Sequence, residues 1–458
     1  MRVSRLEKSI GIEVYATRSP GIGGVIRQLC EDFIVEELLV NGSKAEVRTS
    51  NLSLPTQEKP STSRYLLCIL IKRNWDTFQA LEAIAEQLGI SPQKIHIAGI
   101  KDAKAVTAQH ITIKDVKRED VKNVSIKDVK VVPAGYFQTK LSPYYLLGNT
   151  FQIVIRAISH TKPAIRQRIE KVVEEIAALG GVPNFFGHQR FGTVRPITHL
   201  VGKAIVKGDF RKAAMLFLAK SYPFEHQESR TAREELYRTQ DFKKALKSFS
   251  RSLYYEHLML EHLVKKPDDF QGAFRRLPVK LRILFPQAYQ AYLFNRFLSR
   301  RITLGFPLNA AEVGDHVIRI ETTGLPSQML REIAIQAKLS EINNAIASGK
   351  MRLAIPLVGF RQHLSGGAQG EIEKKILEEE GIAPENFKIK GMPELNLKGG
   401  LRTALTTSKD FKVEEISEDS ANPQKNMVKI SFNLHRGSYA TVFLRELMKP
   451  RNPIKAGF

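Results

Sequence analysis

The most regular pattern of apolar positions along the chain lies between residues 64 and 89. Residues 65–71 form a continuous apolar run of strand length, which is typical of a strand buried on both faces. Asp76 or Thr77 then caps a predicted helix that Gly89 ends. The expected apolar face of this helix consists of Phe78, Leu81, Ile84, Ala85 and Leu88. The pattern therefore predicts a buried strand followed by a helix that packs through one face.

The rest of the chain shows a mixture of strand and helix patterns. Apolar and polar residues alternate at 151–155 and 428–434, and a β-rich run lies at 109–113, so we expect strands there. Helices are predicted from Ser438 onward and over 163–179, 208–280, 285–295 and 371–380. Residues 41–63 are polar and lack periodicity, which predicts a loop.

Composition adds a strong excess of positive charge. The 458 residues, enough for two or three domains, include 70 Lys and Arg against 47 Asp and Glu, a net charge of +23. A protein this basic usually has a polyanionic partner, most often nucleic acid, although a ribosome or a membrane surface would fit the same charge. No window holds the roughly eighteen apolar residues that a membrane span requires. Two cysteines, Cys30 and Cys68, predict neither a disulfide framework nor a cysteine-based zinc site, which favours a reducing cytoplasm.

The first candidate for chemistry is an acidic residue in a basic loop. Asp102 follows Gly99 and lies between Lys101 and Lys104, with strand-like segments on both sides. Nearby cations lower the pKa of a carboxyl group and keep it ionised, so Asp102 has the surroundings of a nucleophile. A Lys-Asp turn whose charges are simply solvated has the same composition, and such turns are common. The loop by itself leaves both interpretations open.

The second candidate is the stretch 182–192, which is unusually rich in aromatic and amide groups. It contains three Phe and two Gly residues together with Asn184, His188, Gln189 and Arg190. Aromatic faces stack on nucleobases, and amides read base edges through paired donors and acceptors. A buried aromatic cluster with satisfied amides is the alternative interpretation.

Both stretches resemble signature motifs of the TruD family of tRNA pseudouridine synthases. Gly99-Ile100-Lys101-Asp102, followed by Ala105-Val106-Thr107 and Gln109, resembles one motif. Residues 184–192 match the family pattern Asn-[Tyr/Phe]-Phe-Gly-x-Gln-Arg-Phe-Gly almost completely. Further similar motifs follow in family order at 148–151, 285–295, 356–359 and 437–447. The resemblance extends from about Gly23 to Arg445, and on it the chain is identified as a member of the family.

The resemblance implies roles for particular residues. Asp102 stands at the place of the catalytic nucleophile. Arg27 takes the place of a basic residue that precedes a Pro-Glu-Asp-Phe run, which here has Cys30 instead of proline. We therefore expect Arg27 to be the ion-pair partner of Asp102, with a plain surface arginine at a strand edge as the alternative. The residues expected to bind the substrate are Phe33, Lys101, Asn184 and Phe186, of which Asn184 would hydrogen-bond the uracil edge and the phenylalanines would enclose the base.

The resemblance also implies an architecture. It predicts an α+β fold with a mixed, largely antiparallel sheet. Residues 1–205 and 400–458 would form the pseudouridine synthase catalytic domain, and residues 206–399 the α/β domain specific to this family, inserted between them. The two domains would flank a cleft for RNA.

The implied activity is isomerisation of uridine to pseudouridine in tRNA, at uridine-13 of the D arm, by an aspartate nucleophile. The expected partner is tRNA, and the chemistry calls for no metal, organic cofactor or membrane. We expect a monomer in the cytoplasm. The alternative is a non-catalytic tRNA-binding or tRNA-folding protein on the same scaffold. The intact motifs around Asp102 and Asn184 argue against that alternative, because a protein that has lost its catalytic activity has no need of an acid in a pocket.

Overall fold

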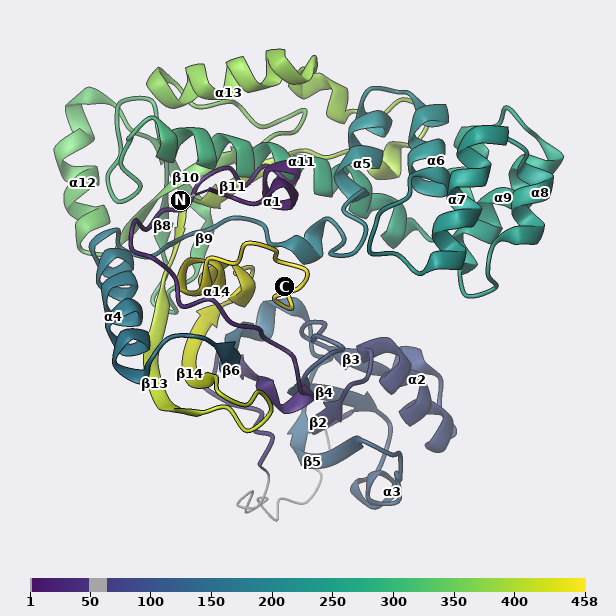
Figure 1. Cartoon of the computed structure of the whole chain (residues 1–458), viewed down its shortest axis with the longest axis horizontal. Coiled ribbons are helices and arrows are strands. Elements are labelled where there is room, and N and C mark those ends of the chain that lie inside the picture. Colours follow the sequence, from purple (N-terminus) through teal and green to yellow (C-terminus); the bar gives the residue numbers. More distant parts are fainter. Residues whose placement is uncertain (1, 49–63) are drawn as a thin grey trace.

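The largest of the sheets in the computed structural model, which describes residues 2–48 and 64–458, has eight strands (Figure 1). The strand order is β13-β14-β6-β1-β4-β2-β5, and β3 pairs with β4 outside this path. Within the described residues only β1 and β4 pair in parallel, so the expected mixed, largely antiparallel sheet is confirmed. The strands are β1 (Phe33–Leu39), β2 (Tyr65–Arg73), β3 (Ile95–Ile97), β4 (Val106–Lys114), β5 (Val129–Phe137), β6 (Leu146–Ile158), β13 (Ser408–Glu418) and β14 (Asn426–His435). Most of the predicted loop at 41–63 lies outside the described residues.

The strand and helix predicted between residues 64 and 89 are present as β2 and α2 (Thr77–Gln87). The Asp76 carboxylate caps α2 by accepting hydrogen bonds from the first backbone amides of the helix. Leu81, Ile84 and Ala85 are buried as predicted, but Phe78 is 50% exposed and the prediction for it is wrong. The buried face instead includes Thr77 and Ala80, because the inward stripe is rotated away from Phe78.

Two further helices support the sheet. α4 (Lys162–Ala178) packs against β13 and against α14 (Ala440–Met448), and all nine residues of α14 are buried. α14 begins at Ala440 rather than at the predicted Ser438, because the backbone of Tyr439 is extended and the Ser438 hydroxyl is hydrogen-bonded to Thr406. The short helix α3 (Arg118–Lys122) packs on β5, whereas the other short helix, α1 (Arg5–Ser9), lies beside α11 (Val279–Thr303) (Figure 1).

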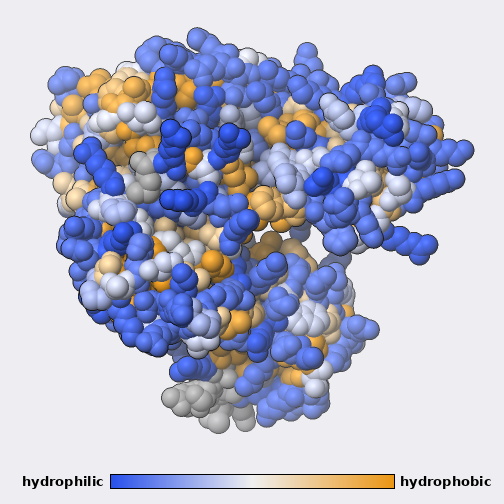
Figure 2. Space-filling model, in the orientation of Figure 1, coloured by the Kyte–Doolittle hydropathy of each residue, from blue (hydrophilic) through white to orange (hydrophobic). Residues whose placement is uncertain are grey.

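The predicted helical stretch at 208–280 is confirmed, and its outer helices α7 to α9 project as an arm on one side of the molecule (Figure 1). An open notch separates this arm from the lobe that carries α2, and apolar residues lie at its inner end (Figure 2). The next helix starts at Val279 rather than at Phe285, because packing on α5 and β10 keeps the chain helical through Pro286. The helices are α5 (Thr198–Val206), α6 (Phe210–Ala219), α7 (Gln227–Thr239), α8 (Phe242–Ser248), α9 (Tyr254–Lys265), α10 (Phe270–Arg275) and α11 (Val279–Thr303).

A second sheet of four strands, in the order β11-β10-β8-β9, lies beside α11, α12 and α13. The predicted domain boundary at residue 400 falls at β11, which pairs with β10 of this sheet, and the domain division itself stays a prediction. The remaining elements are β7 (Val182–Pro183), β8 (His316–Ile320), β9 (Pro326–Ile333), β10 (Met351–Leu357), β11 (Gly400–Thr403), β12 (Leu405–Thr406), α12 (Leu339–Ala347) and α13 (Gly367–Glu380). In the described part of the chain no helix is long and apolar enough to cross a bilayer.

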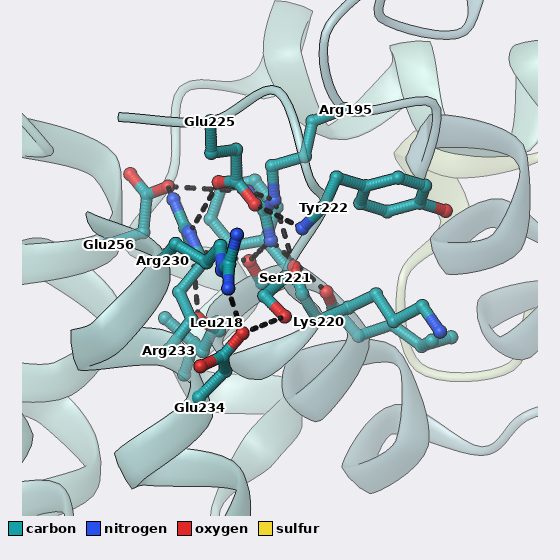
Figure 3. A network of polar contacts seen from close by, with 12 residues as sticks. Arg195, Leu218, Lys220, Ser221, Tyr222, Glu225, Arg230, Arg233, Glu234 and Glu256 are labelled. Atoms are coloured by element: carbon teal, nitrogen blue, oxygen red, sulfur yellow. Dashed lines mark hydrogen bonds and ion pairs between the residues drawn. The ribbon is translucent and has the colours of Figure 1, made fainter. Parts of the chain in front are cut away.

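A buried ion network holds the arm to the rest of the helical region (Figure 3). Arg233 on α7 donates to Glu225 at 3.0 Å and to Glu256 on α9 at 2.6 Å. Arg195, which precedes α5, lies 3.3 Å from Glu225. Burial, followed by the nearby charge of Arg233, lowers the pKa of Arg195 to about 10, so Arg195 is still charged at neutral pH.

The two ends of the described chain are joined by a second buried network, which we call the terminal clasp (Glu7, Thr17, Arg445 and Glu446). Arg445 on α14 donates to Glu7 at 2.5 Å and to Glu446 at 2.9 Å. The Thr17 hydroxyl donates to Glu446 at 2.7 Å. Because all of these groups are buried and paired, the first residues are held against the last helix.

Candidate active site

Asp102 lies on the loop that joins β3 to β4. Because β1 and β4 are parallel and Ile34 is paired with Val106, this loop and the residue that begins β1, Phe33, meet at the same edge of the sheet. The Asp102 side chain is 35% exposed, so its carboxylate faces outward from that edge.

A buried lysine holds the backbone of this loop. Lys72, near the end of β2, donates from Nζ to the carbonyl oxygens of Asp102 and Trp75, both at 2.8 Å. The side chain is fully buried, and this burial lowers the pKa of Lys72 to about 8, while the Asp102 carboxylate opposes the shift. Lys72 therefore brings a positive charge close to Asp102 while binding only its main chain.

Lys101 points to the opposite side of the loop from Asp102. Its Nζ lies 2.7 Å from the Glu37 carboxylate and donates to Asn149 at 2.9 Å, and its side chain is 3% exposed. Its main chain exchanges hydrogen bonds with the Thr77 hydroxyl at the start of α2. In this structure the Lys101 ammonium is paired inside the protein, where Lys101 anchors the loop, and its role in substrate binding stays a prediction.

Arg27 brings the Asp102 loop and Phe33 together. Its Nη2 lies 3.5 Å from Asp102 Oδ1, and its guanidinium carbon lies 4.0 Å from the centre of the Phe33 ring. Its Nη1 donates to the carbonyl oxygen of Gly457 at 3.0 Å. The backbone of Arg27 is left-handed, with φ at 58°, which aims the side chain along the edge of the sheet. Burial lowers the pKa of Arg27, and the facing Asp102 carboxylate opposes that shift, so the guanidinium stays charged beside the carboxylate.

A second cluster forms around Asn184 and Phe186, which follow β7. The Phe186 ring packs edge-on against Phe294 of α11 and Tyr439. Arg402 of β11 covers the ring, with its guanidinium carbon 4.1 Å from the ring centre. The alternative interpretation of residues 182–192 was a buried aromatic cluster with satisfied amides. Its first part agrees with the structure, because Phe186 packs in an aromatic cluster.

Arg402 also fixes the side-chain amide of Asn184. It donates to Asn184 Oδ1 at 2.6 Å and to the Asn184 carbonyl at 2.8 Å, while Asn184 Nδ2 donates to the Thr403 hydroxyl at 3.1 Å. A guanidinium only donates, so the atom facing Arg402 must be the amide oxygen. The hydrogen that remains on Nδ2 is a donor suited to a carbonyl oxygen such as those of uracil.

The residues that follow α14 connect the two clusters. Gly457 accepts the hydrogen bond from Arg27, and the ring of Phe458 lies 5.9 Å from that of His188 in the 184–192 stretch. The chain end labelled in Figure 1 accordingly lies between α14 and the β3–β4 end of the sheet. The structure therefore brings Arg27, Phe33 and Asp102 together, and the residues after α14 contact both Arg27 and His188, which follows Asn184 and Phe186 in the chain.

Lys72, Arg402 and Gly457 are candidate functional residues that sequence reasoning did not identify. Lys72 carried a usable signal, because it is a lone lysine directly after an apolar strand run. Arg402 and Gly457 carried none. Among the described residues, no group of three His, Cys, Asp or Glu side chains is placed to hold a metal ion.

Comparison with known proteins gives a consistent result over nearly the whole chain. The family described as tRNA pseudouridine synthase D (TruD) matches residues 9–447. A probable tRNA pseudouridine synthase D of Methanosarcina acetivorans is 40% identical over 452 residues, covering 98% of each chain. A probable tRNA pseudouridine synthase D of Methanopyrus kandleri is also 40% identical, over 84% of this chain and 85% of its own. The crystal structure of a putative tRNA pseudouridine synthase D from Methanosarcina mazei superposes with a TM-score of 0.83 at 39% identity, covering 99% of this chain and all of that one.

Proposed function

The chain belongs to the TruD family of tRNA pseudouridine synthases, isomerases that act on uridine in tRNA, and on this premise we propose that it uses Asp102 as its nucleophile on uridine-13 of the D arm. The reaction breaks the N1–C1′ bond, turns the detached uracil over and forms a C5–C1′ bond, while C5 loses its proton and N1 gains one. No atom is gained or lost overall. The protein must therefore supply a nucleophile, an enclosure for the detached base and a grip on the RNA.

The Arg27–Asp102 pair is the observation that carries the proposal. An aspartate acts as a nucleophile only when it is ionised and accessible. Arg27 at 3.5 Å places a guanidinium counter-charge beside the Asp102 carboxylate, whose side chain is 35% exposed. Lys72 fixes the main chain behind it, so the carboxylate is held in place without being covered.

Phe186 is the aromatic residue we assign to the detached base, and Phe33, which is buried beneath Arg27, is assigned to the support of that guanidinium. Phe33 lies against Arg27, and Phe186 is held by Arg402 beside Asn184. The remaining Nδ2 hydrogen of Asn184 can donate to a carbonyl oxygen such as those of uracil, so Asn184 suits uridine as the substrate base. We also keep the division into a catalytic domain (1–205 and 400–458) and an inserted domain (206–399), with RNA held between them.

The test is site-mapped pseudouridine formation on unmodified total tRNA, without added cofactor. Wild type is expected to give product at one D-arm uridine, and Asp102→Asn is expected to fold, bind tRNA and give none. Asp76→Asn is the matched control, because Asp76 is a nearby aspartate that only caps α2 and asparagine caps a helix equally well. Turnover near wild type in Asp102→Asn would refute the assignment. Absence of product from wild type, with salt-sensitive tRNA binding retained, would favour the non-catalytic tRNA-binding protein.

A further inference from the structure

A cavity of about 1050 Å³ lies beside the candidate active site and is lined by positive charge. The cations on its wall come from three places: the first residues, α4 and the segment after α14. None of the described residues that line it is an aspartate or a glutamate. The lining cations are Arg2, Arg168, Lys449, Arg451 and Lys455. His160 also lines the cavity.

Two of these cations are built into the wall. Arg168 donates to the carbonyl oxygen of Gly21 at 2.8 Å. Lys449 is buried and donates to the carbonyl oxygens of Thr17 at 2.8 Å and Ser19 at 2.5 Å. Both side chains bind main-chain carbonyls rather than carboxylates, and Glu446 and Glu175 act on Lys449 through charge without a direct ion pair. Burial lowers the pKa of His160, and the nearby charge of Arg168 lowers it further. His160 is therefore neutral at neutral pH.

The other three cations face the solvent. Arg2, Arg451 and Lys455 are exposed, and within the described part of the chain their side chains make no hydrogen bond or ion pair. Five cations around one hollow repel each other, and the free energy of that repulsion is recovered when an anion enters. A single small anion would neutralise only part of this charge. Consecutive phosphates of a nucleic acid strand would meet cations at several points of the wall.

The walls of the cavity continue into the candidate active site. Residues 20–25 form one wall and lead directly to Arg27, and the amide of Ile26 donates to the carbonyl of Ala456 on the opposite wall. Ala456 is followed by Gly457, which accepts the hydrogen bond from Arg27. An RNA strand lying in the cavity would therefore run past the residues that hold Asp102.

We propose that this cavity binds backbone phosphates of the substrate RNA, in the part of the strand that flanks the target uridine. The inference rests on the proposed function, since it places RNA at Asp102. The cavity contributes affinity and leaves the chemical step unchanged. Its cations recognise the phosphates through charge, so binding there is independent of base sequence.

The test is the salt dependence of tRNA binding by the full chain carrying Arg451→Gln and Lys455→Gln. Each phosphate contact that is lost lowers the slope of log Kd against log salt by about 0.7–0.9. The double variant should therefore lose about 1.5 units of slope and bind tRNA roughly tenfold more weakly at 0.1 M salt. At saturating tRNA its kcat should equal that of wild type. The matched control is Lys388→Gln with Lys390→Gln, two exposed lysines that do not line the cavity. The control pair should change neither the slope of log Kd against log salt nor kcat.

The possible results separate clearly. An unchanged slope and Kd in the double variant would overturn the inference, and so would an equal loss in the control pair, because then only net charge matters. Pyrophosphate binding is measured on the same proteins as a probe of a small ligand. If the double variant loses pyrophosphate binding but binds tRNA as wild type does, the inference is overturned in favour of a small phosphorylated ligand. Failure of the wild type to form pseudouridine would instead refute the proposed function, while the slope would still report whether the cavity holds RNA.

Discussion

Replacing Arg402 by methionine tests whether the orientation of the Asn184 amide matters for catalysis. The change keeps an unbranched apolar side chain against the Phe186 ring but removes every hydrogen-bond donor. Burial lowers the pKa of Arg402 to about 10, so at neutral pH the wild-type side chain is charged and its hydrogen bonds are charge-assisted. Three carbonyl oxygens lose this donor in the variant: the main-chain and side-chain oxygens of Asn184 and the carbonyl of Gly437.

The expected magnitude follows from these contacts. A hydrogen bond to a charged group contributes about 1.5–3 kcal/mol. Since Gly437 is exposed and regains water, we expect the free energy of unfolding to fall by about 3 kcal/mol. Without Arg402 the Asn184 amide can turn over and present its oxygen to the base. Losing one hydrogen bond to the base in this way should lower kcat roughly 10- to 100-fold, or about 1.4–2.7 kcal/mol of activation free energy.

The assay is single-turnover pseudouridine formation at saturating tRNA, combined with urea unfolding of each variant. Arg190→Met is the matched control, because Arg190 also lies over the Phe186 ring, at 5.8 Å, but bonds Gln287 instead of Asn184. The control should keep kcat within about threefold of wild type. Arg402→Lys should keep the charge over the ring without the paired donors, and so recover stability more than kcat. A destabilised Arg402→Met that retains wild-type kcat would show that the amide orientation is irrelevant to the reaction.

Two further predictions concern buried charges. Glu256→Gln should lower the free energy of unfolding by about 3 kcal/mol, because it leaves buried Arg233 without its full counter-charge. The control, Glu234→Gln at an exposed ion pair, should lower it by less than about 0.5 kcal/mol. Equal effects of the two changes in urea unfolding would contradict the assignment of this network. For Lys72, the folded pKa of about 8 lies below the ordinary 10.5, so between these values the unfolded chain binds more protons and stability rises with pH. Lys72→Met should therefore lack this rise relative to wild type in unfolding measured between pH 8 and 10.5, and an identical pH profile would refute the low pKa.

The elements that could be predicted from the sequence are those whose signal is local. β2 was evident because seven neighbouring residues are apolar, and β14 because its buried side chains alternate with half-buried ones. Phe78 shows the limit of such patterns. It fits the apolar stripe of α2 by spacing, but the packing of Thr77 and Ala80 on the sheet decides which face turns inward. That packing is a tertiary property.

The candidate site was predictable only where a motif could be matched. Asp102 and Arg27 were selected by resemblance, and the structure supplies the distance between them. Lys101 shows what adjacency in sequence hides: it is next to Asp102, but its side chain crosses to Glu37 in the core. Lys72 and Arg402 act on residues 30 and 218 positions away, and no local pattern predicts contacts of that kind.

The terminal clasp constrains the order in which parts of the protein fold during synthesis. Glu7 can form its hydrogen bond only once Arg445 has been synthesised, and Arg27 only once Gly457 has been synthesised. The sequence separations are 438 and 430 residues. A ribosome releases the early residues long before their partners exist, while the helical arm can fold from contacts among near neighbours. The guanidinium beside Asp102 is therefore positioned only in the last step of folding. A chain interrupted before that step would carry every motif of the enzyme and lack the geometry that joins them.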